Sequence, residues 1–211
     1  MNKPLLLSCL EQMELSFSDE QMLQLENYYK TLEYFNPLLR MVKADGDDFI
    51  VRHFADSLVA VKTLQDIAKG YEKPVIADLG SGAGLPGIPL AIALPSCRFV
   101  LVERMEKRVD FLLTVLAACK IGNATVLNRR LCEVAEKFEI VTCRAFHPFY
   151  DVESEVDSVL ADGGTVMLYK GRMEVLQYEL GQLKGDWKFD LQSVKVPYLD
   201  AQRTLCIGRK K

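Results

Sequence analysis

The sequence predicts an α/β fold in which a mostly parallel sheet of seven strands follows an N-terminal helical extension. Apolar residues recur at helical spacing in the first third of the chain, whereas short β-branched runs alternate with amphipathic segments from Pro74 onward. Such alternation is typical of parallel strands joined by right-handed crossovers, with helices on both faces of the sheet. We therefore expect a helical extension over residues 1–70 and an α/β domain over residues 71–211.

Two stretches predict the helices of the extension. Ser18 and Gln21 have the spacing of a capping box, and apolar residues then follow at helical spacing until Pro37, where we expect this helix to stop. A second helix is expected from about Asp48 to Ile67, because its apolar residues form a similar stripe.

The strands are predicted from five β-branched runs and from the C-terminal tail. The runs are VIADLG (75–80), RFVLVE (98–103), ATVLN (124–128), FEIVTCRA (138–145) and GGTVMLYKG (163–171). The intervening segments EKRVDFLLTVLAACK and YDVESEVDSVLA predict helices. The tail, residues 187–208, predicts two further strands that pair as an antiparallel edge. Ligands of such sheets bind beyond the carboxyl ends of the strands, so each strand end is a candidate site position.

Composition excludes several classes of protein. The chain has 211 residues, 49% of them hydrophobic, which is enough for one well-buried core. No run of about 18 apolar residues and no signal-peptide cleavage pattern occurs, so we expect a cytoplasmic protein with no membrane association. The six cysteines form no CxxC pair, so neither a disulfide framework nor a metal site is expected. The net charge of -3 argues against nonspecific coating of nucleic acid but allows a local basic face.

The first predicted strand ends in a glycine-rich turn, DLGSGAGLPG. Gly80, Gly82 and Gly84 have GxGxG spacing, which permits a tight turn from strand to helix and a close approach of the backbone to a ligand. Asp78 precedes the turn, and Glu103 ends the next strand. Acidic residues at that strand end accept hydrogen bonds from ribose hydroxyls in nucleotide-binding folds. These features together indicate a nucleoside-containing ligand.

The same turn distinguishes between two cofactors. A dinucleotide fingerprint needs glycine three positions after Gly82, where this chain has Leu85. The carboxylate of Asp78 would repel a pyrophosphate, whereas it suits a ligand that carries an amine and a sulfonium. The turn therefore predicts an S-adenosylmethionine site, and a tight βα turn without a ligand is the alternative.

Several segments together resemble one family of methyltransferases. VRHFADSL, DLGSGAGLPGIPLAI, EKRVDFL, CRAF, LYKG and LDAQRTL are similar to the glucose-inhibited division protein B family, which methylates guanine N7 in 16S rRNA of the small ribosomal subunit. The resemblance implies a Rossmann-like class I methyltransferase fold, S-adenosylmethionine as cofactor, and 16S rRNA or the small ribosomal subunit as partner. We also expect a monomer.

The resemblance implies a cofactor site with three parts: the glycine loop, the ribose carboxylate and the segment RRLCEV after the third strand. The implied cofactor-binding residues are Asp78, Gly80, Ser81, Gly82, Gly84, Leu85, Glu103, Arg130, Leu131, Cys132, Glu133 and Arg144. In RRLCEV, Leu131 or Cys132 stands where the family's acidic residue often falls, and Glu133 comes one place late. We therefore expect backbone groups near Leu131 to contact the adenine.

Basic strand ends supply the remaining candidates. Arg144 and Ala145 match the family's Arg-Ala after the fourth strand, and Lys170 precedes its glycine after the fifth. The resemblance makes Arg144 and Lys170 catalytic residues that position the substrate, with a salt bridge and a solvated side chain as the respective alternatives. The implied substrate-binding residues are Arg52, His53, Lys170 and Arg203.

One segment departs from the family pattern. In NPLLRMVKA, Asn36 fits the family, but Arg40 and Val42 replace a later asparagine and threonine. We expect a local compensation in which Arg40 contacts phosphate.

The expected chemistry needs no general base, because guanine N7 exposes a lone pair and loses no proton on methylation. Alignment and a suitable electrostatic environment would supply the rate. A methyltransferase for a small molecule or a protein, an inactive binding protein on the same fold and, remotely, a nicotinamide oxidoreductase are the alternatives.

Overall fold

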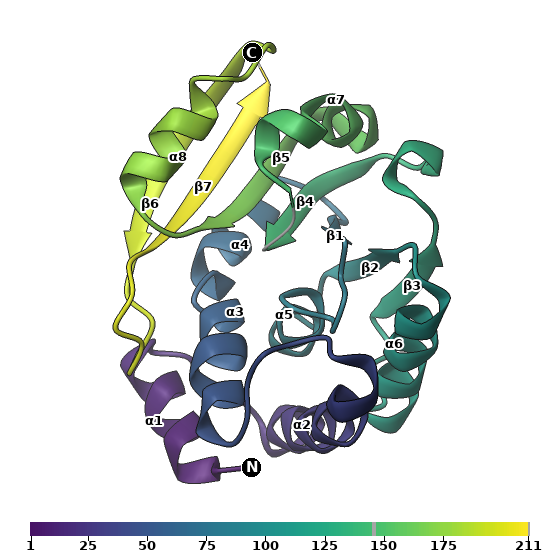
Figure 1. The fold of residues 1–211 in the computed structure, drawn as a ribbon, viewed down its shortest axis with the longest axis vertical. Coiled ribbons are helices and arrows are strands. Elements are labelled where there is room, and N and C mark those ends of the chain that lie inside the picture. Colours follow the sequence, from purple (N-terminus) through teal and green to yellow (C-terminus); the bar gives the residue numbers. More distant parts are fainter. Residues whose placement is uncertain (145–146, 211) are drawn as a thin grey trace.

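The structure is a computed structural model that describes residues 1–144 and 147–210, and it contains one seven-stranded sheet of order β3-β2-β1-β4-β5-β7-β6 (Figure 1). The strands are β1 (Val75–Leu79), β2 (Arg98–Glu103), β3 (Ala124–Asn128), β4 (Phe138–Arg144), β5 (Leu160–Lys170), β6 (Trp187–Val194) and β7 (Arg203–Lys210). Strands β1 to β5 are parallel, and β7 pairs antiparallel with both β5 and β6. The predicted sheet and its antiparallel edge are therefore confirmed.

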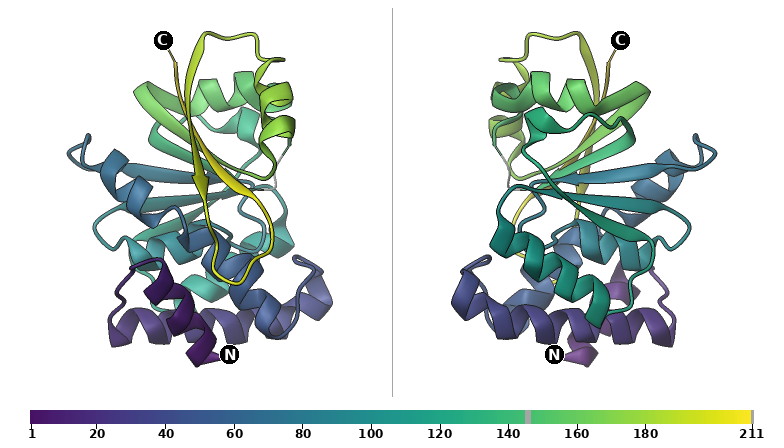
Figure 2. Two further views of the ribbon diagram at one scale, coloured as in Figure 1. Left: turned by 90° about the vertical axis from the view of Figure 1, so that its left-hand side faces the viewer. Right: turned by 90° about the vertical axis from the view of Figure 1, so that its right-hand side faces the viewer.

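Helices cover both faces of this sheet (Figure 2). They are α1 (Lys3–Gln12), α2 (Asp19–Leu39), the π-helix η1 (Phe49–Ala55), α3 (Asp56–Leu58), α4 (Val61–Ala68), α5 (Gly87–Ala93), α6 (Glu106–Ala118), the 3₁₀ turn η2 (Leu131–Glu133), α7 (Phe149–Val159) and α8 (Met173–Leu180). Side chains of α1 to α6 pack on one face and those of α7, α8 and η2 on the other. Alternate residues of each strand serve the two cores, as in Ile140 and Val141 of β4.

The N-terminal helices share a hydrophobic core with the sheet. Leu25 and Leu32 of α2 belong to the same buried cluster as Ile76 of β1 and Phe99 of β2. Burial of this apolar surface stabilises the helices and the sheet together. No helix in the described part of the chain is long and apolar enough to cross a membrane.

Helix α2 begins as predicted and ends later than predicted. Ser18 and Gln21 form the expected capping box. The helix passes through Pro37 to Leu39, so the predicted stop at Pro37 is wrong. Proline removes one hydrogen bond, and this loss is tolerated here because the helix ends one turn later, with Arg40 at φ 48° and its N–H bonded to the Asn36 carbonyl.

The predicted helix from Asp48 to Ile67 consists of three pieces. A π-helix, η1, leads into the single turn α3, and α4 follows after a break at Val59 and Ala60. The N–H of Asp56 donates to the carbonyl of Val51, five residues earlier, as in a π-helix. The apolar stripe did not reveal this change of pitch, because five-residue and four-residue spacing bury similar side chains over one turn.

Two boundaries near β5 also differ from the prediction. Strand β5 starts at Leu160, although residues 160 and 161 were expected at the end of a helix. A register shift against β4 between Phe138 and Ile140 accommodates the earlier start. The run of residues 163–171 is confirmed as the main part of this strand, and α8 is an additional helix.

Candidate functional site

The carboxyl ends of the parallel strands border two adjoining cavities. Cavity A, of about 610 Å³, lies between the loop after β1, the helical segment η1–α3 and the adjacent ends of β4, β5 and β7. Cavity B, of about 660 Å³, lies between the end of β2, η2, α6 and α7. Gly80 and Arg108 line both cavities. Both volumes are in the range of small-molecule sites.

The loop after β1 has the backbone geometry that its glycines suggested. Gly80, Gly82 and Gly84 have φ of 67°, 56° and 86°, a region that other residues rarely adopt. A Cβ on Gly84 would also lie 2.3 Å from Ile88 Cδ1. Glycine at position 84 is thus required by both the turn and the packing of α5.

Asp78 supports this loop from inside the protein. It is 1% exposed, lines neither cavity, and accepts hydrogen bonds from the Gly87 N–H at 3.1 Å and the Thr142 hydroxyl at 3.2 Å. Burial raises the pKa of Asp78 to about 6. The structure therefore gives this carboxylate a supporting place beneath the loop, with Ser81 and Leu85 above it lining cavity A.

Glu103 connects β2 to the glycine loop. It is 4% exposed, and its carboxylate accepts hydrogen bonds from the N–H groups of Gly82 at 3.0 Å and of Arg104 and Met105 at 2.9 Å. A carboxylate accepts about four hydrogen bonds, so one position is left in cavity B for a further donor such as a ribose hydroxyl. Arg108 lies 3.8 Å from the same carboxylate.

The segment after β3 forms the far wall of cavity B. Arg130, Leu131 and Cys132 line the cavity, and Leu131 is buried whereas Cys132 is exposed. Glu133 does not line it, because its carboxylate accepts a hydrogen bond from the Arg130 N–H at 3.0 Å and so closes the η2 turn. Of the four predicted residues, three therefore line cavity B and one stabilises the turn.

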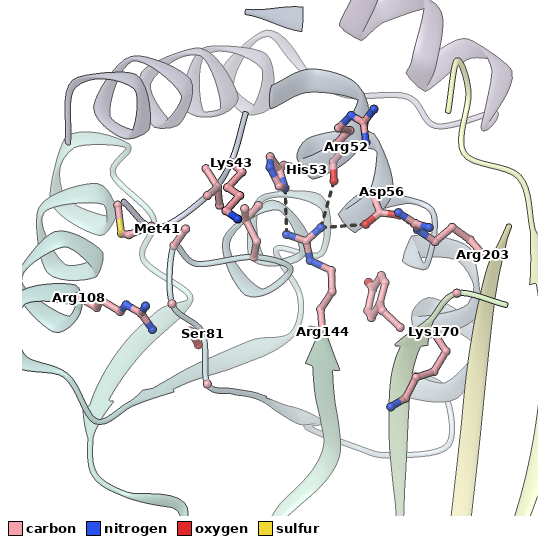
Figure 3. A pocket seen from close by; sticks show the side chains of 17 residues that line it. Met41, Lys43, Arg52, His53, Asp56, Ser81, Arg108, Arg144, Lys170 and Arg203 are labelled. Carbon is pink, nitrogen blue, oxygen red and sulfur yellow. Dashed lines mark hydrogen bonds and ion pairs between the residues drawn. The ribbon is translucent and has the colours of Figure 1, made fainter. Parts of the chain in front are cut away.

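A cluster of charged side chains occupies the mouth of cavity A (Figure 3). Arg144, at the end of β4, donates to Asp56 at 2.9 Å and to the carbonyl of Arg52 at 3.3 Å. Arg203, at the start of β7, donates to the other oxygen of Asp56 at 2.6 Å. His53 lies 3.5 Å from Arg144. The structure thus brings together three of the predicted site residues around an aspartate.

His53 is held in its neutral form. Burial, followed by the Arg144 charge, lowers the pKa of His53 to about 4. Its Nδ1 faces a guanidinium, which can only donate, so Nδ1 accepts and the proton lies on Nε2. Among the described residues, His53 Nε2 and Arg144 Nε have no hydrogen-bond partner. At neutral pH His53 can therefore donate a hydrogen bond from Nε2 but is too weakly basic to take up a second proton.

Two predicted residues direct their charges elsewhere. The ammonium of Lys170 pairs with Glu179 at 2.5 Å, and Figure 3 shows its side chain pointing away from the arginine cluster. Glu179 also accepts from the N–H of Phe149 at the start of α7. The guanidinium of Arg52 pairs with Asp48 at 3.1 Å, and only its carbonyl contacts the cluster.

A family model described as "rRNA small subunit methyltransferase G" (GidB) matches residues 21–206 of the chain. The chain belongs to the GidB family. A relative named ribosomal RNA small subunit methyltransferase G, from Borrelia hermsii, is 32% identical over 177 residues, which cover 83% of this chain and 84% of the relative. A relative of the same name from Francisella tularensis subsp. holarctica is 30% identical over 203 residues, which cover 96% and 94%.

Solved structures confirm the predicted fold class for this GidB-family chain. Magnesium protoporphyrin IX methyltransferase from Synechocystis PCC 6803, solved with bound S-adenosylmethionine, aligns with a TM-score of 0.60 at 18% identity, covering 87% of this chain and 97% of that one. Precorrin-6y C5,15-methyltransferase from Geobacter metallireducens aligns with a TM-score of 0.52 at 15% identity, covering 72% and 87%. The shared fold is the Rossmann-like class I methyltransferase fold.

Several cavity-lining residues were not predicted from the sequence. Met41, Val42 and Lys43 line cavity A in a loop that Asn36 organises, since its side chain accepts from the Met41 and Val42 N–H groups at 3.0 Å. Arg40 is exposed and lines neither cavity. The closely spaced basic residues Arg104, Lys107 and Arg108 were the available signal for Arg108, and the departure of NPLLRMVKA from the family pattern was the signal for residues 41–43. The predicted match at Ala145 lies outside the described residues.

Within the part of the chain that the structure describes, no group of three His, Cys, Asp or Glu side chains is placed to hold a metal ion.

Proposed function

We propose that this GidB-family chain transfers a methyl group from S-adenosylmethionine to N7 of a guanine in an exposed loop of 16S rRNA. Cavity B would hold the cofactor: Glu103 has one free hydrogen-bonding position for a ribose hydroxyl, and the glycine loop lets a ligand approach the backbone. Bound S-adenosylmethionine supplies an electrophilic methyl group on a sulfonium. The guanine would enter cavity A, which adjoins cavity B at Gly80.

The observation that carries this proposal is that cavity A has several basic side chains and, among its described lining residues, no histidine basic enough to act as a general base. Arg144 and Arg203 can donate to acceptor atoms of a guanine nucleotide, whose N7 edge also carries the O6 acceptor. His53, with a pKa of about 4, is too weakly basic to act as a general base at neutral pH. Methylation of N7 removes no proton, so this arrangement suits the reaction.

The reaction moves an existing positive charge and does not separate new charges. A positive charge leaves the sulfonium and appears on the purine, so the site has only to tolerate a cation and not to create one. Asp56 between Arg144 and Arg203 offsets part of the positive charge of cavity A. The enzyme would therefore act mainly by alignment and by a preorganised electrostatic environment.

The target guanine must be accessible to a cleft of this size. Base edges within A-form helices are poorly reached by proteins, so an unpaired loop is the expected substrate. The overall net charge of -3 favours docking on a defined ribonucleoprotein surface over coating of free RNA. We propose the small ribosomal subunit as the preferred partner.

The test is methyl transfer from labelled S-adenosylmethionine to small subunits and to protein-free 16S rRNA from a strain that lacks the enzyme. Identification of 7-methylguanosine by mass spectrometry would support the proposal, and comparison of the two substrates would show the preferred form. Gly82→Asp serves as the inactive control, because a carboxylate at that position of the loop should abolish cofactor binding. Cofactor binding by the wild type without transfer to either RNA would favour a small-molecule or protein substrate.

A further inference from the structure

Two arginines of cavity A share a single carboxylate, that of Asp56. Its Oδ2 accepts from Arg144 Nη1 at 2.9 Å, and its Oδ1 accepts from Arg203 Nε at 2.6 Å. The side chain of Asp56 is 6% exposed and that of Arg144 is 12% exposed. The three residues come from α3, β4 and β7, so this carboxylate joins three elements at the mouth of the cavity (Figure 3).

We propose that Asp56 is a positioning residue for methyl transfer, which holds the Arg144 and Arg203 guanidinium groups side by side where the guanine nucleotide binds. The proposal rests on the proposed function. A guanidinium is planar and its donors have fixed directions, so a hydrogen bond to one nitrogen orients the others. Without the carboxylate, the two like charges would repel each other and turn toward water.

The backbone that carries Asp56 is anchored independently of the arginines. The hydroxyl of Tyr169, in β5, donates to the carbonyl of Ser57 at 2.8 Å. The hydroxyl of Ser57 donates in turn to the carbonyl of His53 at 2.6 Å. These contacts tie the η1–α3 segment to the sheet through the neighbouring residue. Loss of the Asp56 charge should therefore release Arg203 and leave Arg144 held only by the Arg52 carbonyl and His53, while the helical segment stays in place.

Folding stability alone does not account for this cluster. The desolvation of buried ions cancels much of their attraction, so a buried ion pair adds little net stability. The cluster also retains unused donors, since Arg144 Nε and His53 Nε2 lack partners among the described residues. Buried donors are normally paired, so this surplus points to a ligand that completes the network.

The first test compares Asp56→Asn with a matched control, Asp66→Asn. Asn keeps the shape of the side chain but removes the charge that holds both arginines. We expect kcat for rRNA methylation to fall about 20- to 100-fold, as for misplaced catalytic groups, with the Kd for S-adenosylmethionine changed less than about twofold. Asp66 pairs with Lys69 on the exposed face of α4, so its substitution should change neither quantity. A kcat of Asp56→Asn within about twofold of the wild type would overturn the proposal.

A double variant tests whether Asp56 acts through Arg203. If it does, Asp56→Asn and Arg203→Gln together should lower kcat no more than Asp56→Asn alone, because the arginine is already released. A loss equal to the product of the two single losses would overturn this part of the proposal. If Asp56→Asn alone does not fold, the double variant is compared with Arg203→Gln. The double variant leaves one positive charge fewer without a partner, so it should fold more readily than Asp56→Asn. The comparison then measures the effect of Asp56 through Arg144.

A third measurement does not depend on the substrate. NMR signals of the arginine Nε–Hε groups, assigned with Arg144→Lys and Arg203→Lys, should shift or broaden in Asp56→Asn and stay unchanged in Asp66→Asn. Unchanged signals of both arginines in Asp56→Asn would overturn the positioning role. If the wild type methylates no rRNA, the proposed function fails, and these spectra still decide whether Asp56 fixes the two arginines.

Discussion

Gly84 is the residue of the glycine loop where a single methyl group should be most harmful. Its φ is 86°, and a Cβ would lie 2.3 Å from Ile88 Cδ1 and 3.1 Å from Leu112 Cδ2. We expect Gly84→Ala to lower the free energy of unfolding by about 1–3 kcal/mol and to weaken S-adenosylmethionine binding. Gly122→Ala is the control, because nothing lies within 4 Å of the added Cβ there. Thermal unfolding and calorimetric titration would measure both effects, and a fully stable Gly84→Ala would contradict the packing argument.

The pair of His53 and Arg144 makes a prediction about pH. Because the Arg144 charge contributes to the low pKa of His53, Arg144→Gln should raise that pKa from about 4 toward 6.5, without reaching it since burial remains. An NMR titration of the imidazole, assigned with His53→Asn, would measure it, and Arg129→Gln is the control, because Arg129 lines cavity B and not cavity A. The folded-state pKa lies below the unfolded one, so His53 makes stability fall as the pH drops from about 6.5 to 4. Arg144→Gln should reduce this fall, and an unchanged pKa would exclude the electrostatic coupling.

Site residues that belong to a local sequence motif could be predicted from the sequence, whereas contacts between residues far apart in the chain could not. Glu103 and the glycine loop were predicted because strand ends and turns have local signatures, and they do meet, at the Gly82 N–H. Asp56 and Arg203 are 147 positions apart, and their contact depends on β7 inserting beside β5, which no spacing reveals. Burial likewise decides that Asp78 supports the loop from below, and neighbouring residues do not encode burial.

At the scale of whole elements, helix α2 supports the glycine loop through one tyrosine. Tyr28 is fully buried, stacks on Phe54 with ring centroids 5.1 Å apart, and donates from its hydroxyl to the Ala83 carbonyl at 2.6 Å. Tyr28→Phe should keep the packing and lose this hydrogen bond, which lowers the free energy of unfolding by about 1–2 kcal/mol. It should also weaken cofactor binding, because the loop loses a support.

Chemical denaturation and calorimetric titration of Tyr28→Phe would check both expectations. Tyr34→Phe on the same helix is the matched control, since Tyr34 is 72% exposed and should change neither quantity. Equal behaviour of the two variants would show that α2 does not support the loop through this bond.

Strands and helices differed in how well the sequence predicted them. The β-branched runs located the five parallel strands, because buried parallel strands are nearly continuous in apolar residues, and the C-terminal tail located the two antiparallel ones. The π-helix η1 and the passage of α2 through Pro37 were missed, since both depend on backbone hydrogen bonds that side-chain spacing does not specify. The π-helix matters for the site, because it precedes Asp56 and carries His53.

Over the whole molecule, a net charge of -3 coexists with basic side chains gathered around cavity A. Lys43, Arg52 and Arg108 line that cavity together with the arginine pair. Binding of the rRNA substrate should therefore depend on salt through a small number of contacts, whereas binding of S-adenosylmethionine should depend on it little. Each phosphate contact contributes about 0.7–0.9 to the slope of log K against log salt concentration.

Lys43→Gln should accordingly lower this slope by about 0.7–0.9 if the ammonium contacts a phosphate, and should weaken binding to all RNA sequences alike. Lys30→Gln is the matched control, because Lys30 lies on the exposed face of α2, pairs with Glu26 and lines neither cavity. Fluorescence anisotropy with a labelled rRNA fragment between about 50 and 200 mM salt would give the slopes. Equal slopes for the wild type and both variants would remove Lys43 from the RNA-binding surface. A steep slope that persists in every cavity A variant would place the RNA contacts on another face of the protein.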